Sequence, residues 1–302
     1  DIWKPIIIEK HNPLHLGYTS GHILYKCEFT PKSYKKLLIK LNIRHKAAIW
    51  LNGSYVGGMV NYTAKTAALF KPGPMNGPDF KLFGTRLFDL TPQLIHAKNT
   101  LFVITESLGQ SKHFFPTNDS KLPRGILTAK FSKPVLNKKW YISGTNVTNL
   151  SDPYDTAGLP GEKRNYHKNE NGNGWKSVDT WNILPDDQIV WYTTTFGWDI
   201  SENERTPLRV HLEGKFNSTI YLNGHCIGRY WGGAGPQHDF FLMDHLLQSK
   251  NIVTLACWTS IPDEVKIVIE PYRIELRSGN IKKGGKEGVK EVFATKTKEF
   301  IF

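Results

Sequence analysis

The chain has 302 residues, a formal net charge of +12 at neutral pH, 39% hydrophobic residues and nine tryptophans. This length allows two domains that each bury a full core. No apolar run is long enough to cross a membrane, and the basic residues form no block beside a nucleic-acid motif, so we expect neither a membrane span nor a nucleic-acid partner.

The first half of the chain predicts short strands joined by tight turns. Strand-like segments are ILYKCEF (23–29), LLIKL (37–41), AIWLNGSYVGG (48–58) and KNTLFV (98–103). Asn52-Gly53 is the strongest two-residue hairpin signal, because a type I′ turn needs positive φ at both central positions. Alternation places Ile49 and Leu51 on one face of the strand and Trp50 on the other.

The second half repeats these segments in the same order. The counterparts are VWYTTTF (190–196), LRVHL (208–212), TIYLNGHCIGR (219–229) and KNIVTL (250–255). Leu208 and Asn223 each lie 171 residues after their counterparts, whereas Lys250 lies 152 residues after Lys98. Four matches in order predict two copies of one all-β domain, the first with 19 extra residues after its turn.

The domain limits follow from composition. We expect a first domain at 1–133 and a second at 185–277. Between them, residues 134–184 predict one strand and a long loop rich in Asp, Asn, Gly and Pro that packs on the second domain. Residues 278–302 read as a basic, mobile tail, since six lysines fall in its last 21 positions.

The second turn continues with a motif that resembles a known family. IYLNGHCIGRYWGGAGPQHDFFL (220–242) contains Asn-Gly, Gly-Arg-Tyr and Gly-Pro-Gln in the order found in the jelly-roll domains of glycoside hydrolase family 35 β-galactosidases, most closely the fungal type. GYTSGHILYKCEF (17–29), LPRGIL (122–127), GEKRNYH (161–167) and WYTTTF (191–196) match further family segments. The resemblance spans roughly 17–259 and implies two tandem jelly-roll β-sandwiches of the galactose-binding-like type.

In the family these domains follow a catalytic barrel that carries two glutamates, one as acid/base and one as nucleophile. The family's Ile-Glu-Asn-Glu segment has no counterpart here, and two sandwiches leave no room for a barrel of about 250 residues. We therefore expect no catalytic residue in this chain. β-Galactosidase activity would need a barrel upstream of Asp1 or on a partner.

The aromatic residues near the second turn predict a carbohydrate site, because sugars stack apolar faces on aromatic rings and offer hydroxyls to forked donors and amides. The predicted carbohydrate-binding residues are Arg229, Tyr230, Trp231, Gln237 and His238, covered from the long loop by Tyr166, His167 and Trp175. In the alternative interpretation, Tyr230 and Trp231 wedge the two domains together or dock on the barrel.

Three functions remain open: an accessory module that braces a catalytic barrel, a lectin-like protein that binds β-galactosides or cell-wall glycans, and a structural interaction protein. Glycosylation sequons favour passage through the secretory pathway; the candidates are Asn61, Asn118, Asn146, Asn149 and Asn217, while the sequon at Asn52 can serve the turn alone. The chain begins without Met, so we expect a processed or cut fragment of a secreted protein.

Cysteine and acidic residues predict no cofactor. Three cysteines make no disulfide framework, and whether Cys226 pairs with Cys257 stays open. Asp152, Asp155 and Glu162 offer oxygens to calcium, but their spacing forms no EF-hand. We expect no metal site.

Overall fold

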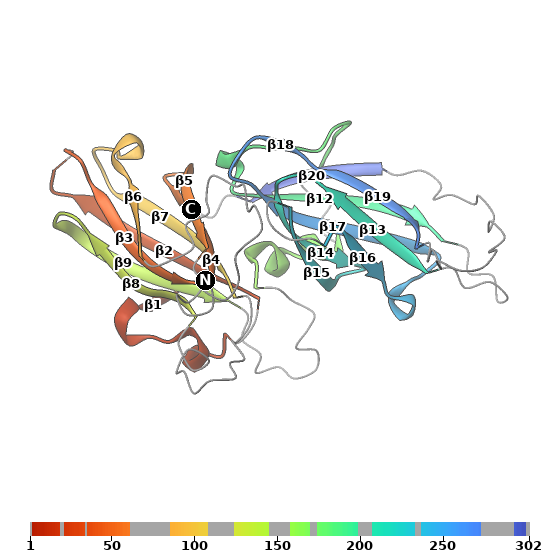
Figure 1. Cartoon of the computed structure of the whole chain (residues 1–302), viewed down its shortest axis with the longest axis horizontal. Coiled ribbons are helices and arrows are strands. Elements are labelled where there is room, and N and C mark those ends of the chain that lie inside the picture. The colour runs from red at the N-terminus through yellow and green to blue at the C-terminus, as the bar shows by residue number, and fades with distance from the viewer. Residues whose placement is uncertain are drawn as a thin grey trace, which may run out of the picture. The chain divides into compact units, whose positions relative to one another are not determined.

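The computed structural model describes residues 2–18, 21–33, 35–60, 85–107, 124–144, 158–169, 174–198, 207–232, 237–272 and 293–299. The chain divides into two compact units, Asp1–Lys163 with Phe300–Phe302, and Arg164–Glu299. Each unit is a β-sandwich whose strands are labelled in Figure 1. The prediction of an all-β chain with two tandem jelly-roll sandwiches is confirmed.

The described residues of the first unit form two antiparallel sheets. Its six-stranded sheet has the order β1 (Lys4–Ile6), β9 (Val135–Gly144), β2 (His22–Pro31), β7 (Asn99–Glu106), β4 (Lys46–Leu51) and β5 (Ser54–Val60). Its three-stranded sheet has the order β6 (Arg86–Asp89), β3 (Leu38–Arg44) and β8 (Gly125–Phe131).

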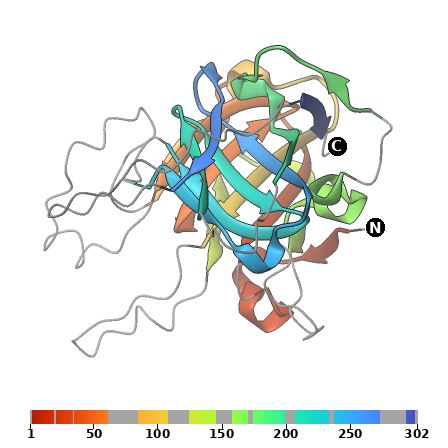
Figure 2. The same cartoon turned by 90° about the vertical axis from the view of Figure 1, so that its right-hand side faces the viewer.

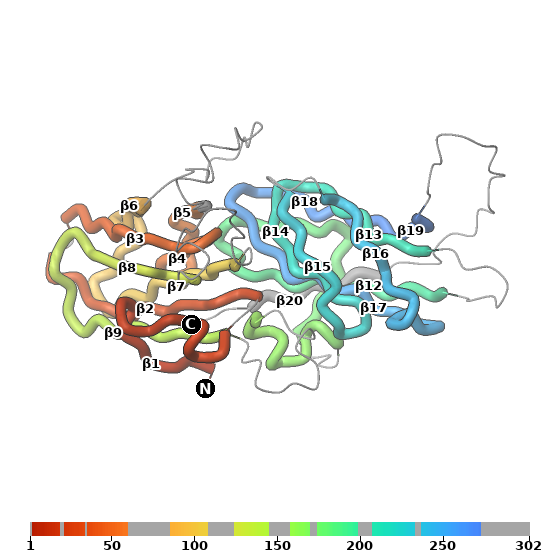
Figure 3. Tube along the Cα trace, turned by 60° about the horizontal axis from the view of Figure 1, so that its bottom comes forward, coloured from red at the N-terminus to blue at the C-terminus, as the bar shows by residue number. Residues whose placement is uncertain are grey.

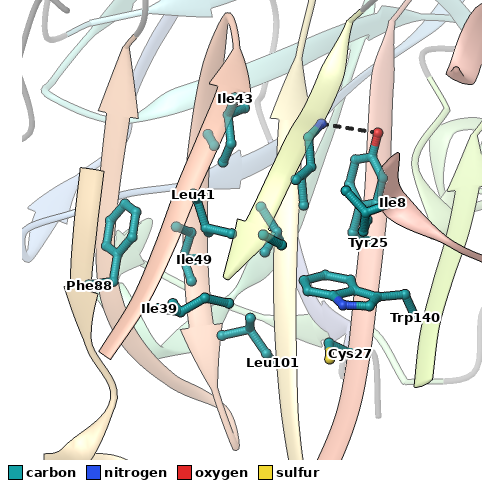
Figure 4. Packing of buried hydrophobic residues seen from close by; sticks show 14 of the residues in the cluster. Ile8, Tyr25, Cys27, Ile39, Leu41, Ile43, Ile49, Phe88, Leu101 and Trp140 are labelled. Atoms are coloured by element: carbon teal, nitrogen blue, oxygen red, sulfur yellow. Dashed lines mark hydrogen bonds between the residues drawn. The ribbon is translucent and has the colours of Figure 1, made fainter. Parts of the chain in front are cut away.

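The two sheets of the first unit enclose one hydrophobic core. Figure 4 shows Tyr25 and Cys27 of β2 packed with Trp140 of β9, and Ile39 and Leu41 of β3 on the facing side. Alternate residues point inward because successive side chains of a strand lie on opposite faces. The Ile126 amide donates to the buried Tyr25 hydroxyl at 3.2 Å, the dashed contact of Figure 4, so this polar atom is satisfied inside the core.

The second unit has the same kind of construction. Its six-stranded sheet has the order β10 (Lys176–Ser177), β20 (Phe293–Glu299), β12 (Ile189–Gly197), β17 (Lys250–Trp258), β14 (Asn217–Leu222) and β15 (His225–Trp231). One smaller sheet has the order β16 (Asp239–Leu242), β13 (Leu208–Glu213) and β19 (Lys266–Pro271), whose strands run from teal to blue in Figure 2. The other is the pair β11 (Asn182–Ile183) and β18 (Asp263–Glu264).

The described helices are short 3₁₀ segments of three to five residues. They are η1 (Ile8–Lys10), η2 (Pro13–Leu16), η3 (Thr91–Gln93), η5 (Pro160–Arg164), η6 (Tyr166–Lys168), η7 (Pro185–Asp187) and η8 (Asp244–Leu246). Within the part of the chain that the structure describes, no helix has the length and apolarity needed to cross a membrane.

The strand orders of the two units are equivalent. The order β9-β2-β7-β4-β5 corresponds to β20-β12-β17-β14-β15, and β6-β3-β8 corresponds to β16-β13-β19. The four segments matched in the sequence fall on equivalent strands, so the repeat extends over eight strand pairs. The extra residues of the first copy lie between β5 and β6, where the offset between the copies changes from 171 to 152.

Both Asn-Gly turns adopt the predicted conformation. Asn52 and Gly53 have φ of 53° and 92°, and Asn223 and Gly224 have 49° and 89°. These angles are those of a type I′ turn, which matches the right-handed twist of the flanking strands.

The domain limits differ from those predicted. The one strand expected within residues 134–184 is β9, which pairs with β2 along most of its length and so belongs to the first unit (Figure 3). β20 pairs with β12 from Ile189↔Glu299 to Thr195↔Phe293, so the predicted tail contains a strand of the second sheet (Figure 1). The sheet that β9 joins and the strand β20 were not foreseen because their partners are distant in sequence, and strand pairing is decided by those partners.

Candidate functional site

The candidate site of the second unit lies on the outer face of its six-stranded sheet, opposite the core. Tyr221 of β14 and Trp191 of β12 point to this face, because their neighbours Ile220, Leu222 and Tyr192 point into the core. The two rings stack with centroids 5.6 Å apart, and both side chains are fully buried. A sheet with one face in a core usually exposes polar residues on the other, so this aromatic layer must be covered.

Part of the cover comes from η6, a short helix within the segment that the sequence predicted as a long loop. Asn165 and Asn169 flank η6 with φ of 57° and 55°, which turns the chain sharply on both sides. Tyr166 lies 5.8 Å from the Trp191 ring and 5.8 Å from the Trp175 ring. The His167 ring lies 5.6 Å from that of Tyr221. The structure thus brings the three predicted loop residues together on the predicted domain.

This layer, formed by Tyr166, His167, Trp175, Trp191 and Tyr221, is called the aromatic layer below. It contains polar atoms without a hydrogen-bond partner among the described residues: His167 Nδ1, Trp175 Nε1 and the hydroxyl of the adjacent Thr219. Burial, with the charges of Lys168 and His225, lowers the pKa of His167 to about 4, so the imidazole is neutral at physiological pH. Buried polar atoms normally find a partner, so these three can receive water or a ligand hydroxyl.

Tyr230, in contrast, is a core residue. Its side chain is 2% exposed and packs against Phe216 and Phe240. Its hydroxyl donates to the Gly214 carbonyl at 2.8 Å, and burial raises its pKa to about 12. The predicted contact between Tyr230 and a sugar therefore has no accessible ring to support it, because Tyr230 fills the sandwich.

The other predicted residues fall in two places. Arg229 and Trp231 alternate with buried Tyr230 along β15, which puts them on the face of the aromatic layer; Arg229 is exposed and Trp231 half-buried. Gln237 and His238 lie next to β16 instead. Gln237 Nε2 donates to the Asp239 carbonyl at 3.1 Å, and His238 Nδ1 lies 2.9 Å from the Leu212 carbonyl. The eight predicted residues do not form one site.

A charged cluster that the sequence interpretation missed lies on the three-stranded sheet of the second unit. Arg209 of β13 donates to Glu270 at 3.0 Å and to Asp239 at 3.0 Å. His211 Nδ1 lies 2.7 Å from Asp239, and the hydrogen bonds to Asp239 and Glu213 raise the pKa of His211. Alternation of Arg209, His211 and Glu213 along the predicted strand was the signal available.

The two cysteines of the second unit are free thiols that lie apart. Cys257 Sγ lies 3.5 Å from Ser218 Oγ on the core face, whereas Cys226 pairs opposite Tyr221, so the two free thiols lie on opposite faces of the sheet.

Of the candidate calcium ligands, Glu162 accepts from the Gly158 and Leu159 amides at 2.8 and 2.7 Å, while Asp152 and Asp155 lie outside the described residues. No cluster of three metal-binding side chains occurs among the residues described.

Of the glycosylation candidates, the structure describes one. Asn217 is the first residue of β14 and is half-buried. Asn61, Asn118, Asn146 and Asn149 lie outside the described residues.

Similarity to solved structures is weak. The lectin from Pleurotus ostreatus in complex with GalNAc matches 88% of this chain and 79% of its own, with 12% identity and a TM-score of 0.23. A score this low carries no argument about fold or function.

Sequence relatives are β-galactosidases of fungi. Beta-galactosidase A of Aspergillus oryzae is 23% identical over 268 residues, which cover 83% of this chain and 25% of that enzyme. Probable beta-galactosidase C of Penicillium rubens is 25% identical over 257 residues, 80% of this chain and 24% of that protein. The chain spans about a quarter of the length of the relatives that it matches.

A domain family matches within this region. Residues 159–261, which hold η6, Trp175 and strands β10 to β17, match the family described as "Beta-galactosidase second all-beta domain". Residues 159–261 are therefore similar to the second all-β domain of β-galactosidases, within a longer segment that is similar to part of fungal β-galactosidases.

Proposed function

We propose that this chain is a non-catalytic, carbohydrate-associated module of a family 35 β-galactosidase, which braces a catalytic barrel of the same protein. The observation that carries the proposal is the match of residues 159–261 to an ancillary β-galactosidase domain, in a chain that spans a quarter of its relatives. Bracing fits the rigid construction of both sandwiches, in which paired strands and closed cores leave fixed surfaces.

The ion pairs and hydrogen bonds of the buried carboxylates support a non-catalytic role. A glycosidase needs two carboxyl groups that flank the scissile bond and are free to exchange protons or attack. Among the described residues, the buried carboxylates already form ion pairs or hydrogen bonds within the protein. Glu106 pairs with Lys46 at 3.0 Å, Glu162 accepts two amides of its own loop, and Asp187 accepts the Leu184 amide at 3.0 Å.

Two measurements test this proposal. The purified chain should release no nitrophenol from nitrophenyl β-galactoside, whereas the product of the full reading frame that includes it should do so. The reading frame upstream of Asp1 should encode a barrel with paired glutamates. A secretion signal directly before Asp1, or galactose release by the chain alone, would overturn the proposal.

A lectin-like function is the second candidate, and the aromatic layer favours it. Tyr166 and Trp175 are half-buried, so their rings keep some accessible surface beside the orphaned Trp175 Nε1 and His167 Nδ1. Aromatic surface next to hydrogen-bonding groups is the combination that binds a galactoside.

Calorimetric titration of the chain with lactose tests this candidate. Binding that is lost in Trp175→Ala and retained in Trp198→Ala, a partly buried indole beside the core of the same unit, supports a lectin site. Equal affinity in the two variants contradicts it. Trp231→Ala extends the test to β15.

Secretion and glycosylation form part of the same proposal. We expect mass spectrometry of the natural protein to find glycans on sequons other than Asn52. The Asn52 side chain donates to the Gln93 carbonyl at 2.9 Å and to Asn99 at 2.8 Å, so it is not free for transfer of a glycan to the folded chain. Glycan on Asn52, or on none of the sequons, would contradict this expectation.

A further inference from the structure

The outer face of the three-stranded sheet in the second unit carries side chains that the proposed function does not use. Strands β16, β13 and β19 are neighbours in this sheet (Figure 1), and alternate residues of each strand point away from the core. We call the outward set the β13 face; its members are Asp239 and Phe241 of β16, Arg209, His211 and Glu213 of β13, Lys266, Val268 and Glu270 of β19, and Tyr272 directly after β19.

Three large apolar side chains of the β13 face are exposed. Phe241 is 49% exposed, Val268 48% and Tyr272 41%. A sheet face that points to water usually carries polar residues, so two aromatic rings and a valine on one such face need an explanation. Exposed apolar side chains that gather among polar groups mark a surface that binds a ligand or a partner.

The strand register sets the distance between the two rings. Phe241 pairs opposite Arg209, and the Tyr272 amide donates to the Pro207 carbonyl at 2.6 Å on the other side of β13. The two aromatic residues therefore lie two strand spacings apart, roughly 10 Å, and two residues apart along the strand direction. This span is wider than one pyranose ring, so it suits a chain of sugars better than a single sugar.

Arg209 is held in a fixed position between the two rings. It donates to Glu270 through Nε at 3.0 Å and to Asp239 through Nη1 at 3.0 Å, and its guanidinium carbon lies 5.6 Å from the centroid of the Tyr272 ring. A carboxylate has about four acceptor sites, so Asp239 and Glu270 can accept from hydroxyl groups as well. Acceptors that are already held in place cost little entropy when a ligand binds them.

The charges of the β13 face balance one another. Arg209 forms ion pairs with Asp239 and Glu270. Lys266 lies opposite Glu213 on the neighbouring strand. The whole chain, in contrast, has a formal net charge of +12. A face with paired charges attracts neither a strongly acidic nor a strongly basic partner, but it offers donors and acceptors to neutral hydroxyl groups.

The β13 face also differs from a surface that docks another protein. In a protein–protein interface the centre is apolar, and charged groups collect at the rim. Here the paired charges of Arg209 lie at the centre, and the exposed rings of Phe241 and Tyr272 flank them. Aromatic rings beside fixed hydrogen-bonding groups are instead the combination that binds sugars.

The first copy of the fold shows that a sandwich of this kind does not require the β13 face. On the equivalent sheet, Leu38 occupies the position of Arg209, and Asp89 occupies that of Phe241. The first copy thus has neither the arginine nor the aromatic ring at these positions, although its strands have the same order. The β13 face is therefore a property of the second copy rather than of the fold.

We propose that the β13 face binds an extended, neutral polysaccharide, whose sugar rings stack on Phe241 and Tyr272. Its hydroxyl groups donate to Asp239 and Glu270, which Arg209 holds in place between the rings. This inference goes beyond the proposed function, because bracing leaves the β13 face unassigned, and the lectin candidate uses the aromatic layer on the other sheet of the unit.

Calorimetric titration of the full chain with three soluble polysaccharides, galactan, xylan and β-glucan, tests the proposal in low and in high salt. We compare the wild type with Phe241→Ala, Tyr272→Ala and Tyr272→Phe. Leu87→Ala is the matched control, since Leu87 is an exposed apolar residue, 58% exposed, on the equivalent sheet of the first copy. Circular dichroism checks the fold of each variant.

Binding of at least one polysaccharide by the wild type and by Leu87→Ala, with affinity reduced about tenfold or more in Phe241→Ala and in Tyr272→Ala, supports the proposal. Tyr272→Phe keeps the ring and should bind as the wild type does. Binding should persist in high salt, because salt screens charge attraction and the ligand is neutral. Trp175→Ala should bind the polysaccharide normally, so failure of the lectin candidate leaves this test unaffected.

The proposal is overturned if none of the three polysaccharides binds the wild type, a result that needs no variant. It is also overturned if Phe241→Ala and Tyr272→Ala bind as tightly as the wild type, or if binding disappears in high salt. A larger fall of Tm on Phe241→Ala in the product of the full reading frame than in the chain alone would show that the β13 face docks on the barrel, and would overturn the proposal as well.

Discussion

The side chains of Asn52 and Asn223 make equivalent hydrogen bonds in the two copies. Asn223 Nδ2 donates to the Leu246 carbonyl at 2.7 Å and to Asn251 at 2.9 Å, while Asn223 Oδ1 accepts from the Ile252 amide at 2.8 Å. Asn52 makes the equivalent bonds to Gln93, Asn99 and Thr100. Each side chain thus ties its hairpin to the neighbouring strand, which the turn signal in the sequence does not reveal.

This network predicts the effect of Asn223→Ala. The substitution leaves the Asn251 and Leu246 groups without their partner and places alanine at positive φ, so we expect a loss of about 2 to 4 kcal/mol in the free energy of unfolding. Urea denaturation measures it, with Gln237→Ala at an exposed position as the control. A loss as small as that of the control would show that the network contributes little.

Among the strands, a bulge and a close glycine–aromatic contact occur twice. The registers shift between Ile49 and Trp50 and between Ile220 and Tyr221. A Cβ at Gly57 would lie 3.3 Å from the Phe88 ring, and one at Gly228 would lie 2.6 Å from the Phe240 ring. The bulge and the small residue let the hairpin approach the opposite sheet closely.

We therefore expect Gly228→Ala to destabilise the second unit by about 1 to 3 kcal/mol through overpacking. Phe240→Leu, which removes the ring that the new methyl group meets, should recover part of this loss in the double variant. Thermal unfolding of the two single variants and the double variant checks the coupling. Strictly additive losses would show that the methyl group meets another neighbour.

Removal of β20 should affect stability, although the sequence analysis placed this strand in a mobile tail. Its seven residues pair with β12 on one side, and two of them, Thr295 and Lys296, pair with β10 on the other. A chain that ends at Tyr272 would leave the edge of β12 unpaired, and open strand edges promote association. We expect this shortened chain to have a lower Tm and to aggregate, as light scattering would show; unchanged stability would mean that β20 is dispensable.

At the scale of the whole molecule, two buried histidines make the free energy of unfolding depend on pH. The pKa values of His45 in the first unit and His167 in the second are lowered to about 4, mainly by burial. Since the unfolded chain takes up these protons near pH 6.5, their contribution is complete above that pH and is lost as the pH falls toward 4.

Urea denaturation at pH 7, 5.5 and 4.5 should therefore show falling stability, by about 2 to 3 kcal/mol for each histidine. Replacement of either one by Asn should flatten the dependence, whereas His96→Gln at an exposed position should not. A slope that persists unchanged in both Asn variants would assign the acid effect to other groups.

The sequence by itself determined the repeat, the Asn-Gly turns and the faces of their strands, because a turn that needs positive φ and a period of two are local properties. It also placed Tyr166, His167 and Trp175 on the second domain. Only the tertiary structure decided that Tyr230 fills the core, that β9 joins the sheet of the first unit and that β20 is a strand of the second. These outcomes depend on partners far away in the chain, and local patterns carry no information about which distant strand a segment joins.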